Sequence, residues 1–150
     1  MKTTILKAFI AFSFLTLISC SDKSKGDPMA PDDTSSVIGQ VDILKSGTLS
    51  SQSSTNTKGM VAIVKDANGK YFVQLSDSFT TKFSTGTVTV YLATSQVLNL
   101  TTSSSYQLVA VVGKPGEQYF SLPGLPDSKF THAIIWCGAA AIPFGFAMLE

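Results

Sequence analysis

Residues 60–75 read MVAIVKDANGKYFVQL, and this stretch decides the fold class. Two compact apolar runs flank a short polar segment whose Asn68-Gly69 pair supplies the positive backbone angles that a tight hairpin requires. Alternate residues of a strand point to opposite faces, so the second run has one face to bury. The stretch therefore predicts a β-hairpin. Its second strand places Tyr71, Val73 and Leu75 on one face, and Phe72 and Gln74 on the other.

Similar short runs continue along the chain on the C-terminal side of this hairpin, and one precedes it. They are rich in Val, Thr, Tyr and Phe and are separated by polar or Gly/Pro turns. No segment keeps a helical period over three turns. We therefore expect an all-β fold: a single antiparallel β-sandwich or barrel-like domain of about seven or eight strands. The predicted strands are 41–49, 60–65, 71–75, 88–93, 106–112, 119–122, 133–137 and 145–149, and residues 50–57 are expected to be a polar loop with no capacity to pack.

The N-terminus has the features of an export signal. Lys2 and Lys7 precede the apolar stretch 8–18, which as a helix would span about 16 Å, well short of a bilayer core of about 30 Å. It is therefore typical of a secretory signal and not of a membrane span. The residues Leu17-Ile18-Ser19-Cys20 resemble the lipobox of bacterial lipoproteins. That resemblance implies cleavage before Cys20 and a diacylglycerol on its sulfur; the alternative is a plain secretory signal that ends in cysteine.

This interpretation divides the chain into three parts. Residues 1–19 are the lipoprotein signal peptide, residues 20–36 are the lipidated cysteine and a flexible tether, and residues 37–150 are the β domain. The tether is rich in Ser, Asp, Lys, Gly and Pro and has too few large apolar residues to pack. The expected location is the bacterial cell envelope, on the periplasmic or outer-membrane face, with the membrane bound through the lipid on Cys20.

Composition excludes several classes of function. The chain contains no arginine, and the part from Cys20 onward carries nine Lys against ten Asp plus Glu. Because bidentate binding of phosphate depends on arginine, a nucleic-acid binder or phosphoryl-transfer enzyme is not expected. His132 is the only histidine, so no metal ligand set is predicted. No Gly-x-Ser-x-Gly motif occurs either, and the sequence favours a protein without a catalytic centre of its own.

Cys137 is the one cysteine that remains once Cys20 is assigned to the lipid. Single thiols are unusual in exported proteins, where cysteines are normally paired. On a strand, Cys137 shares a face with Ala133 and Ile135, while His132 and Trp136 point to the opposite face. A cysteine among apolar neighbours is either a small buried side chain or a reactive thiol, and a reactive thiol needs a nearby cation or helix N-terminus. Both interpretations stay open from the residues alone.

From about residue 43 to residue 149 the chain resembles the DM-thirteen domain, a small domain named for electron transfer. The motifs follow in family order, and the last of them is the most specific. They are Lys45-Ser46-Gly47-Thr48-Leu49, Ala62-Ile63-Val64, Val90-Tyr91-Leu92, Gly116-Glu117-Gln118-Tyr119, Ile135-Trp136-Cys137 and Phe144-Gly145.

This resemblance implies a β-rich domain in which Cys137 is the redox-active position. If the domain moves electrons, we expect Trp136 and Phe144 to shape access to Cys137. A single thiol would need a redox or cytochrome-type protein partner. No cofactor is evident, and a haem held by Cys137 or His132 stays open, since one axial ligand suffices. The alternative function comes from another class: a non-enzymatic surface binding or structural module in which Cys137 is buried.

Overall fold

The computed structural model describes residues 35–150, and β-strands form most of the regular structure in this range. The all-β prediction is confirmed. The described range contains nine strands, which are the eight predicted ones and one additional strand of two residues. Within the same range no helix is long and apolar enough to cross a membrane. The strands are β1 (Asp42–Thr48), β2 (Ser50–Ser51), β3 (Met60–Lys65), β4 (Tyr71–Leu75), β5 (Val88–Ala93), β6 (Tyr106–Val112), β7 (Gln118–Leu122), β8 (His132–Cys137) and β9 (Ile142–Met148), and the 3-10 turns are η1 (Phe83–Thr85) and η2 (Ser103–Ser105).

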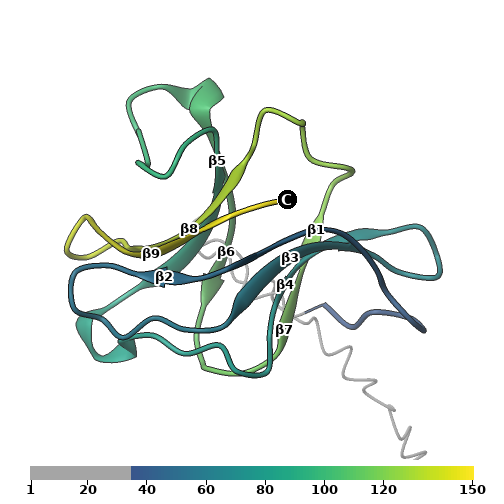
Figure 1. The fold of residues 1–150 in the computed structure, drawn as a ribbon, viewed down its shortest axis with the longest axis horizontal. Helices are drawn as coiled ribbons and strands as arrows, with labels where there is room; N and C mark the ends of the chain where they lie inside the picture. Colours follow the sequence, from purple (N-terminus) through teal and green to yellow (C-terminus); the bar gives the residue numbers. More distant parts are fainter. Residues whose placement is uncertain (1–34) are drawn as a thin grey trace, which may run out of the picture.

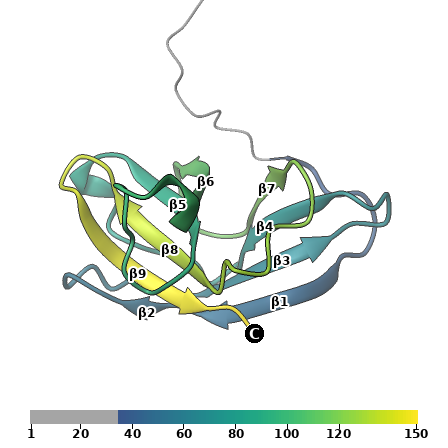
Figure 2. The ribbon, with the colours of Figure 1, turned by 90° about the horizontal axis from the view of Figure 1, so that it is seen from above.

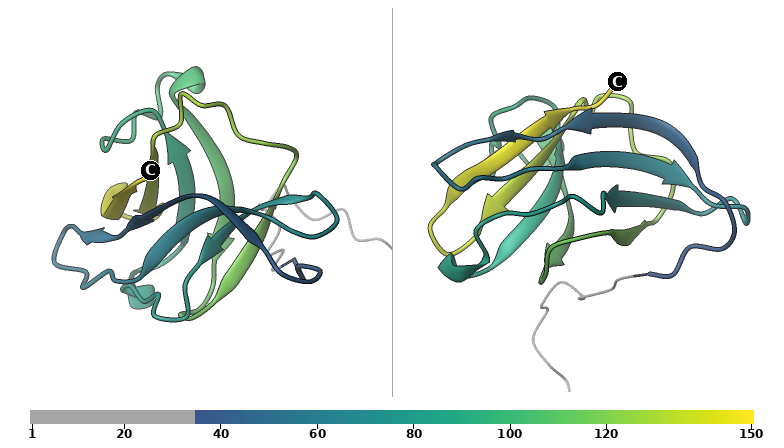
Figure 3. Two further views of the ribbon diagram at one scale, coloured as in Figure 1. Left: turned by 45° about the vertical axis from the view of Figure 1, so that its right-hand side comes forward. Right: turned by 60° about the horizontal axis from the view of Figure 1, so that its bottom comes forward.

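The strands form two antiparallel sheets. One has the order β1-β3-β4-β7 and the other β2-β9-β8-β5-β6. The sheets face each other at an angle and do not close into a barrel, so the domain is a sandwich (Figures 1 and 2). β1 and β2 follow each other along one edge and belong to different sheets (Figure 3). Leu49, which lies between them, is buried in the core.

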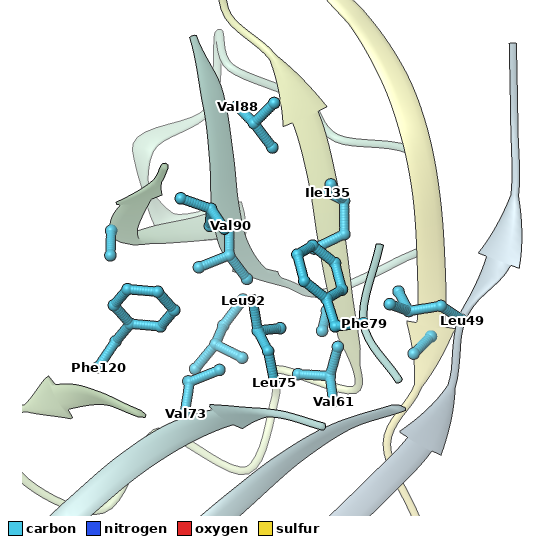
Figure 4. Packing of buried hydrophobic residues seen from close by; sticks show 14 of the residues in the cluster. Leu49, Val61, Val73, Leu75, Phe79, Val88, Val90, Leu92, Phe120 and Ile135 are labelled. Atoms are coloured by element: carbon cyan, nitrogen blue, oxygen red, sulfur yellow. The ribbon is translucent and has the colours of Figure 1, made fainter. Parts of the chain in front are cut away.

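The main core fills the space between the two sheets. The four-stranded sheet contributes Val61, Val73 and Leu75, and the five-stranded sheet contributes Val90 and Ile135. Figure 4 shows Phe79, from the loop after β4, among these side chains. Burying a side chain of this size contributes about 1.5–3 kcal/mol, so these inner faces hold the sheets together.

The predicted hairpin is present, but its turn differs from the expected one. β3 and β4 pair from Val61 opposite Leu75 to Lys65 opposite Tyr71. Within this turn only Gly69 takes a positive φ, of 79°. The Asp66 carboxylate accepts hydrogen bonds from the backbone N–H groups of Asn68 and Lys70, both at 2.9 Å. This side chain organises the turn, so the prediction of positive angles at both Asn68 and Gly69 was wrong.

The prediction that residues 50–57 cannot pack was also wrong. Thr55 and Thr57 are buried, with 5% and 2% of their surface exposed. Thr55 Oγ1 donates to the carbonyl oxygen of Phe144 at 2.7 Å and lies 2.7 Å from Thr57 Oγ1. A buried hydroxyl is tolerated once its hydrogen bonds are made, and the β9 backbone provides a partner here.

The first described residues cover part of the outer face of the four-stranded sheet. Ser35 N donates to the carbonyl oxygen of Tyr119 at 2.9 Å. Val37 and Val41 pack against a small second cluster on this face, formed by Ala62, Val64 and Phe72. The predicted signal peptide, Cys20 and the tether as far as residue 34 lie outside the described residues.

Candidate functional site

Cys137 is the last residue of β8, at one end of the five-stranded sheet. It lies opposite Val88 of β5 on one side and Ile142 of β9 on the other. Its side chain belongs to the main core and has 0% of its surface exposed. Ala133 and Ile135 are in the same core cluster, as the alternation along the strand predicts.

The thiol is covered by Thr85, the last residue of η1. Cys137 Sγ lies 3.8 Å from the carbonyl oxygen of Thr85 and 3.9 Å from its Oγ1. Thr85 itself is exposed. The sulfur therefore lies only one residue below the surface, although none of it is accessible in this conformation.

Thr85 and the rest of η1, which we call the cover of the thiol, are held in place by the turn between β8 and β9. Gly138 N donates to the carbonyl oxygen of Thr87 at 2.8 Å. Gly86 has a φ of 116°, and a Cβ at this position would lie 2.8 Å from the Cβ of Ala139. Both the backbone angle and the close approach favour glycine. Behind the cover, the rings of Phe83 and Phe79 meet edge to face at 6.3 Å between centroids.

The two residues expected to shape access to Cys137 lie on different faces of the sheet. Phe144 is in the main core with Cys137 and is 1% exposed. It occupies an irregularity in the β8–β9 register, between the residues that pair with Ile135 and Trp136. Trp136 is partly exposed and points to the outer face, away from the thiol. The structure thus places Phe144, but not Trp136, on the same face of the sheet as Cys137.

His132 also lies on the outer face, so it does not pair with the thiol. Its Nδ1 is 2.9 Å from Thr131 Oγ1. Burial lowers the pKa of His132 below its ordinary value, which favours the neutral ring. The hydrogen-bond partners of Cys137 both belong to the uncharged Thr85. The site therefore contains no paired cation of the kind that activates a thiol.

In this conformation the surroundings of Cys137 do not present its sulfur to a metal ion or haem. Among residues 35–150, no three His, Cys, Asp or Glu side chains are grouped closely enough to share a metal ion. A haem iron would need direct contact with Sγ, which Thr85 and the surrounding core cover. Ligation by Cys137 would therefore require displacement of η1.

The contribution of Thr85 and Gly86 was missed by the sequence analysis. Thr85 lies 52 residues before Cys137, and no local pattern links the two. They meet because β5, which follows Gly86, pairs with β8 along its whole length. Only the strand order of the sheet brings the cover over the thiol.

Several cavities lie elsewhere on the described part of the domain, and two of them differ clearly in character. A polar one of about 620 Å³ is bordered by the threonine-rich loops and two lysines, and a more apolar one of about 220 Å³ lies beside β1. Their lining residues do not include Cys137. They are Ser54, Thr55, Asn56, Lys58, Thr80, Thr81 and Lys82 for the first, and Leu44, Lys45, Ile63, Leu125, Pro126, Asp127 and Phe130 for the second.

Comparison with known proteins gives one match. The family model described as electron transfer DM13 matches residues 48–149, which include nearly all the strands and Cys137. The resemblance to the DM-thirteen domain is thereby confirmed. No curated protein and no solved structure matches the chain.

Proposed function

The chain belongs to the electron transfer DM13 family, and we propose that it is a lipid-anchored electron-transfer domain of the bacterial cell envelope whose redox atom is the sulfur of Cys137. The observation that carries this proposal is that the thiol, although buried, lies directly beneath an exposed residue. Cys137 is the one free cysteine in the described part of the chain, and both polar contacts of its sulfur are with Thr85, an exposed residue. A small movement of η1 would be enough to expose the sulfur.

The proposed reaction is thiol–disulfide exchange with a partner protein. The Cys137 thiolate attacks one sulfur of a partner disulfide, a new S–S bond forms, and the second partner sulfur leaves as a thiolate that takes up the proton lost by Cys137. A thiol of a second, dithiol partner then attacks the Cys137 sulfur, which releases the first partner with both of its sulfurs reduced. The other thiol of the second partner closes a disulfide and releases Cys137 as a thiol, so two electrons pass from the second partner to the first. A partner is required because one cysteine cannot close a disulfide within the domain.

The step that can be tested is the movement of η1, with Thr85, away from the Cys137 thiol. Thr85 is tied locally by a hydrogen bond from its Oγ1 to the carbonyl oxygen of Lys82, at 3.2 Å. Residue 87 is tied to Gly138. Such a short, exposed segment opens at a lower free energy than the whole domain unfolds.

The test is the rate at which Cys137 of the native full chain is alkylated, resolved by peptide mass spectrometry and followed at low urea concentrations. We expect a rate that hardly depends on urea and exceeds the rate that global unfolding allows. Gly86→Ala should raise it, because its Cβ would push η1 away from Ala139. Gly113→Ala is the matched control, since a Cβ there meets nothing within 4 Å. Labelling that occurs only through global unfolding would overturn the proposal.

The lipid anchor is proposed from the N-terminal residues. A short positively charged start, an apolar stretch and Leu17-Ile18-Ser19-Cys20 support cleavage before Cys20 and attachment of a diacylglycerol. Mass spectrometry of the N-terminal peptide from membranes should find Cys20 lipidated. Cys20→Ser should move the protein into the soluble envelope fraction. An unmodified Cys20 in membrane-bound protein would contradict the anchor.

A second candidate is a surface binding module in which Cys137 only fills the core. The complete burial of its side chain among apolar residues favours this candidate. Cys137→Ser separates the two. The redox function predicts a folded protein that forms no mixed disulfide and transfers no electrons, whereas the binding function predicts unchanged binding.

A further inference from the structure

The outer face of the five-stranded sheet is lined by large apolar side chains. Leu108, Tyr91, Ile134 and Phe146 are direct cross-strand partners in β6, β5, β8 and β9. They form a row across four strands, which at a spacing of about 4.8 Å is roughly 14 Å long. We call this row, together with Tyr106 and Trp136, the outer aromatic face.

Two rings of this face are in contact, and others cover a buried side chain. Tyr91 and Tyr106 meet edge to face at 5.8 Å between ring centroids. Ile134 has 0% of its surface exposed, yet it belongs to neither core cluster. Its cross-strand partners are Tyr91 and Phe146, so their rings cover it. The face is thus an ordered platform and not a scatter of exposed residues.

The two outer faces of the sandwich differ in what covers them. The face of the four-stranded sheet is partly covered by Val37 and Val41 of the chain itself. The described elements form two layers, and no third layer lies over the outer aromatic face (Figure 2). Partly exposed aromatic side chains that gather on one uncovered face are typical of an interaction surface.

The outer aromatic face also lacks charge. No Lys, Arg, Asp or Glu occurs in residues 88–113 or 130–149, which include strands β5, β6, β8 and β9. Charged partners such as nucleic acids or acidic glycans would find no counter-charge on it. The chemistry of the face therefore fits an uncharged ligand.

Three polar groups on the face remain available for a ligand. Within residues 35–150, the hydroxyls of Tyr91 and Tyr106 and the indole N–H of Trp136 have no protein hydrogen-bond partner. None of the three is among the buried polar atoms that lack a partner, so water reaches them and ligand hydroxyls can take its place. Tyrosine and tryptophan combine a flat apolar ring with such a polar group, which suits ligands that are apolar on one face and hydroxylated at the edge.

We propose that the outer aromatic face binds a neutral glycan chain. The apolar C–H face of each sugar ring stacks on Tyr91, Tyr106 or Trp136, and the sugar hydroxyls exchange hydrogen bonds with the three free polar groups. The row across the sheet is long enough for a short oligosaccharide. This proposal names a ligand class for the binding-module candidate, and it holds whether or not Cys137 takes part in electron transfer, because the thiol lies on the other side of the sheet.

Trp136 provides the test, since it is the only tryptophan of the chain and its fluorescence reports on this face alone. The full chain, in a detergent without a sugar headgroup, is titrated with neutral oligosaccharides: gluco-, manno- and N-acetylglucosamine hexamers. We expect a saturable change of Trp136 emission with at least one of them. Tyr106→Ala should weaken that binding at least about fivefold.

The matched control is Tyr71→Ala, since Tyr71 and Tyr106 are both partly exposed first residues of their strands, in different sheets. It should leave the affinity unchanged, with the unfolding midpoint of each variant measured beside it. The proposal is overturned if no neutral oligosaccharide changes the emission at millimolar concentration, or if Tyr71→Ala weakens binding as much as Tyr106→Ala. Micromolar self-association that Leu108→Lys abolishes would overturn it too, by assigning the face to a second copy. None of these results changes the Cys137 labelling rate, so this failure is distinguishable from failure of the electron-transfer proposal.

Discussion

The surroundings of Cys137 determine how reactive its thiol can be. Its position on β8 places it in a close-packed core, where a thiol behaves as a small apolar group. No charged group forms a hydrogen bond with it, so its reactivity depends on access through Thr85 and not on a neighbouring charge.

The burial of Cys137 predicts an order of stability among its variants. Cys137→Ala should lower the free energy of unfolding by about 1 kcal/mol, because it leaves a small void. Cys137→Ser should lower it by about 1–3 kcal/mol, because a hydroxyl then lies in an apolar site with only Thr85 in reach. Urea unfolding of the three proteins checks this order. A serine variant as stable as the native protein would mean that water already enters the site.

His132 predicts a dependence of stability on pH. Burial lowers its pKa in the folded protein, so the folded state favours the neutral ring. The associated stability is present above the unfolded-state pKa of about 6.5 and is lost as the pH falls through the folded-state value. The urea midpoint should therefore fall from pH 7.5 to 5.5, and less so in His132→Gln. Equal slopes for the two proteins would assign the effect to carboxyl groups instead.

At the scale of elements, the β3–β4 hairpin depends on one carboxylate. Asp66 is 4% exposed and accepts backbone hydrogen bonds from Asn68 and Lys70. It also accepts a longer one, at 3.4 Å, from Ile38 N. The Asp66 side chain thus bonds both the β3–β4 turn and the segment that covers the four-stranded sheet.

Removing this carboxylate should weaken both features together. We expect Asp66→Ala to lower the free energy of unfolding by about 2 kcal/mol, because the backbone N–H groups of Asn68 and Lys70 lose a charged acceptor. It should also speed amide exchange at Ala67, whose N–H donates to the carbonyl oxygen of Ile38 at 3.1 Å. Asp77→Ala is the control, since Asp77 is exposed and bonds only its neighbour Ser78. Similar losses for both variants would contradict the assigned role of Asp66.

At the scale of the whole molecule, the two sheets are joined where the chain end meets β1. Ser46 and Glu150 exchange backbone hydrogen bonds at 2.9 and 3.0 Å. Gly47 makes this junction possible, because a Cβ there would overlap the carbonyl oxygen of Met148. The residue thus permits a close approach that larger side chains exclude.

Gly47→Ala should therefore destabilise the whole domain, by about 1–3 kcal/mol, since the clash is with backbone and not with a flexible side chain. The unfolding should remain a single transition, because both sheets line one core. Gly124→Ala, where a Cβ meets nothing within 4 Å, should change the urea midpoint little. A separate early transition in Gly47→Ala would show that the sheets unfold independently.

Much of the secondary structure was predictable from the sequence. Four strands, β3, β4, β5 and β6, have the predicted bounds. Each is a run of β-branched, aromatic and other apolar residues that ends at turn-forming or polar residues, and these are local properties of the chain. The start of β9 was misplaced because Ile142 and Pro143 look like a turn, yet they pair with Cys137 and Trp136.

The sequence by itself therefore determined the all-β class, the hairpin, the alternation that buries Cys137, and the DM13 motifs. Only the tertiary structure decided which side chains meet. The cover of Thr85 over Cys137 and the row from Leu108 to Phe146 both arise from the order β9-β8-β5-β6. The hydroxyl network of Thr55 arises in the same way from a neighbouring β9 backbone. Strand order depends on packing across the whole core, so residues far apart in the chain gain their partners only when both sheets have formed.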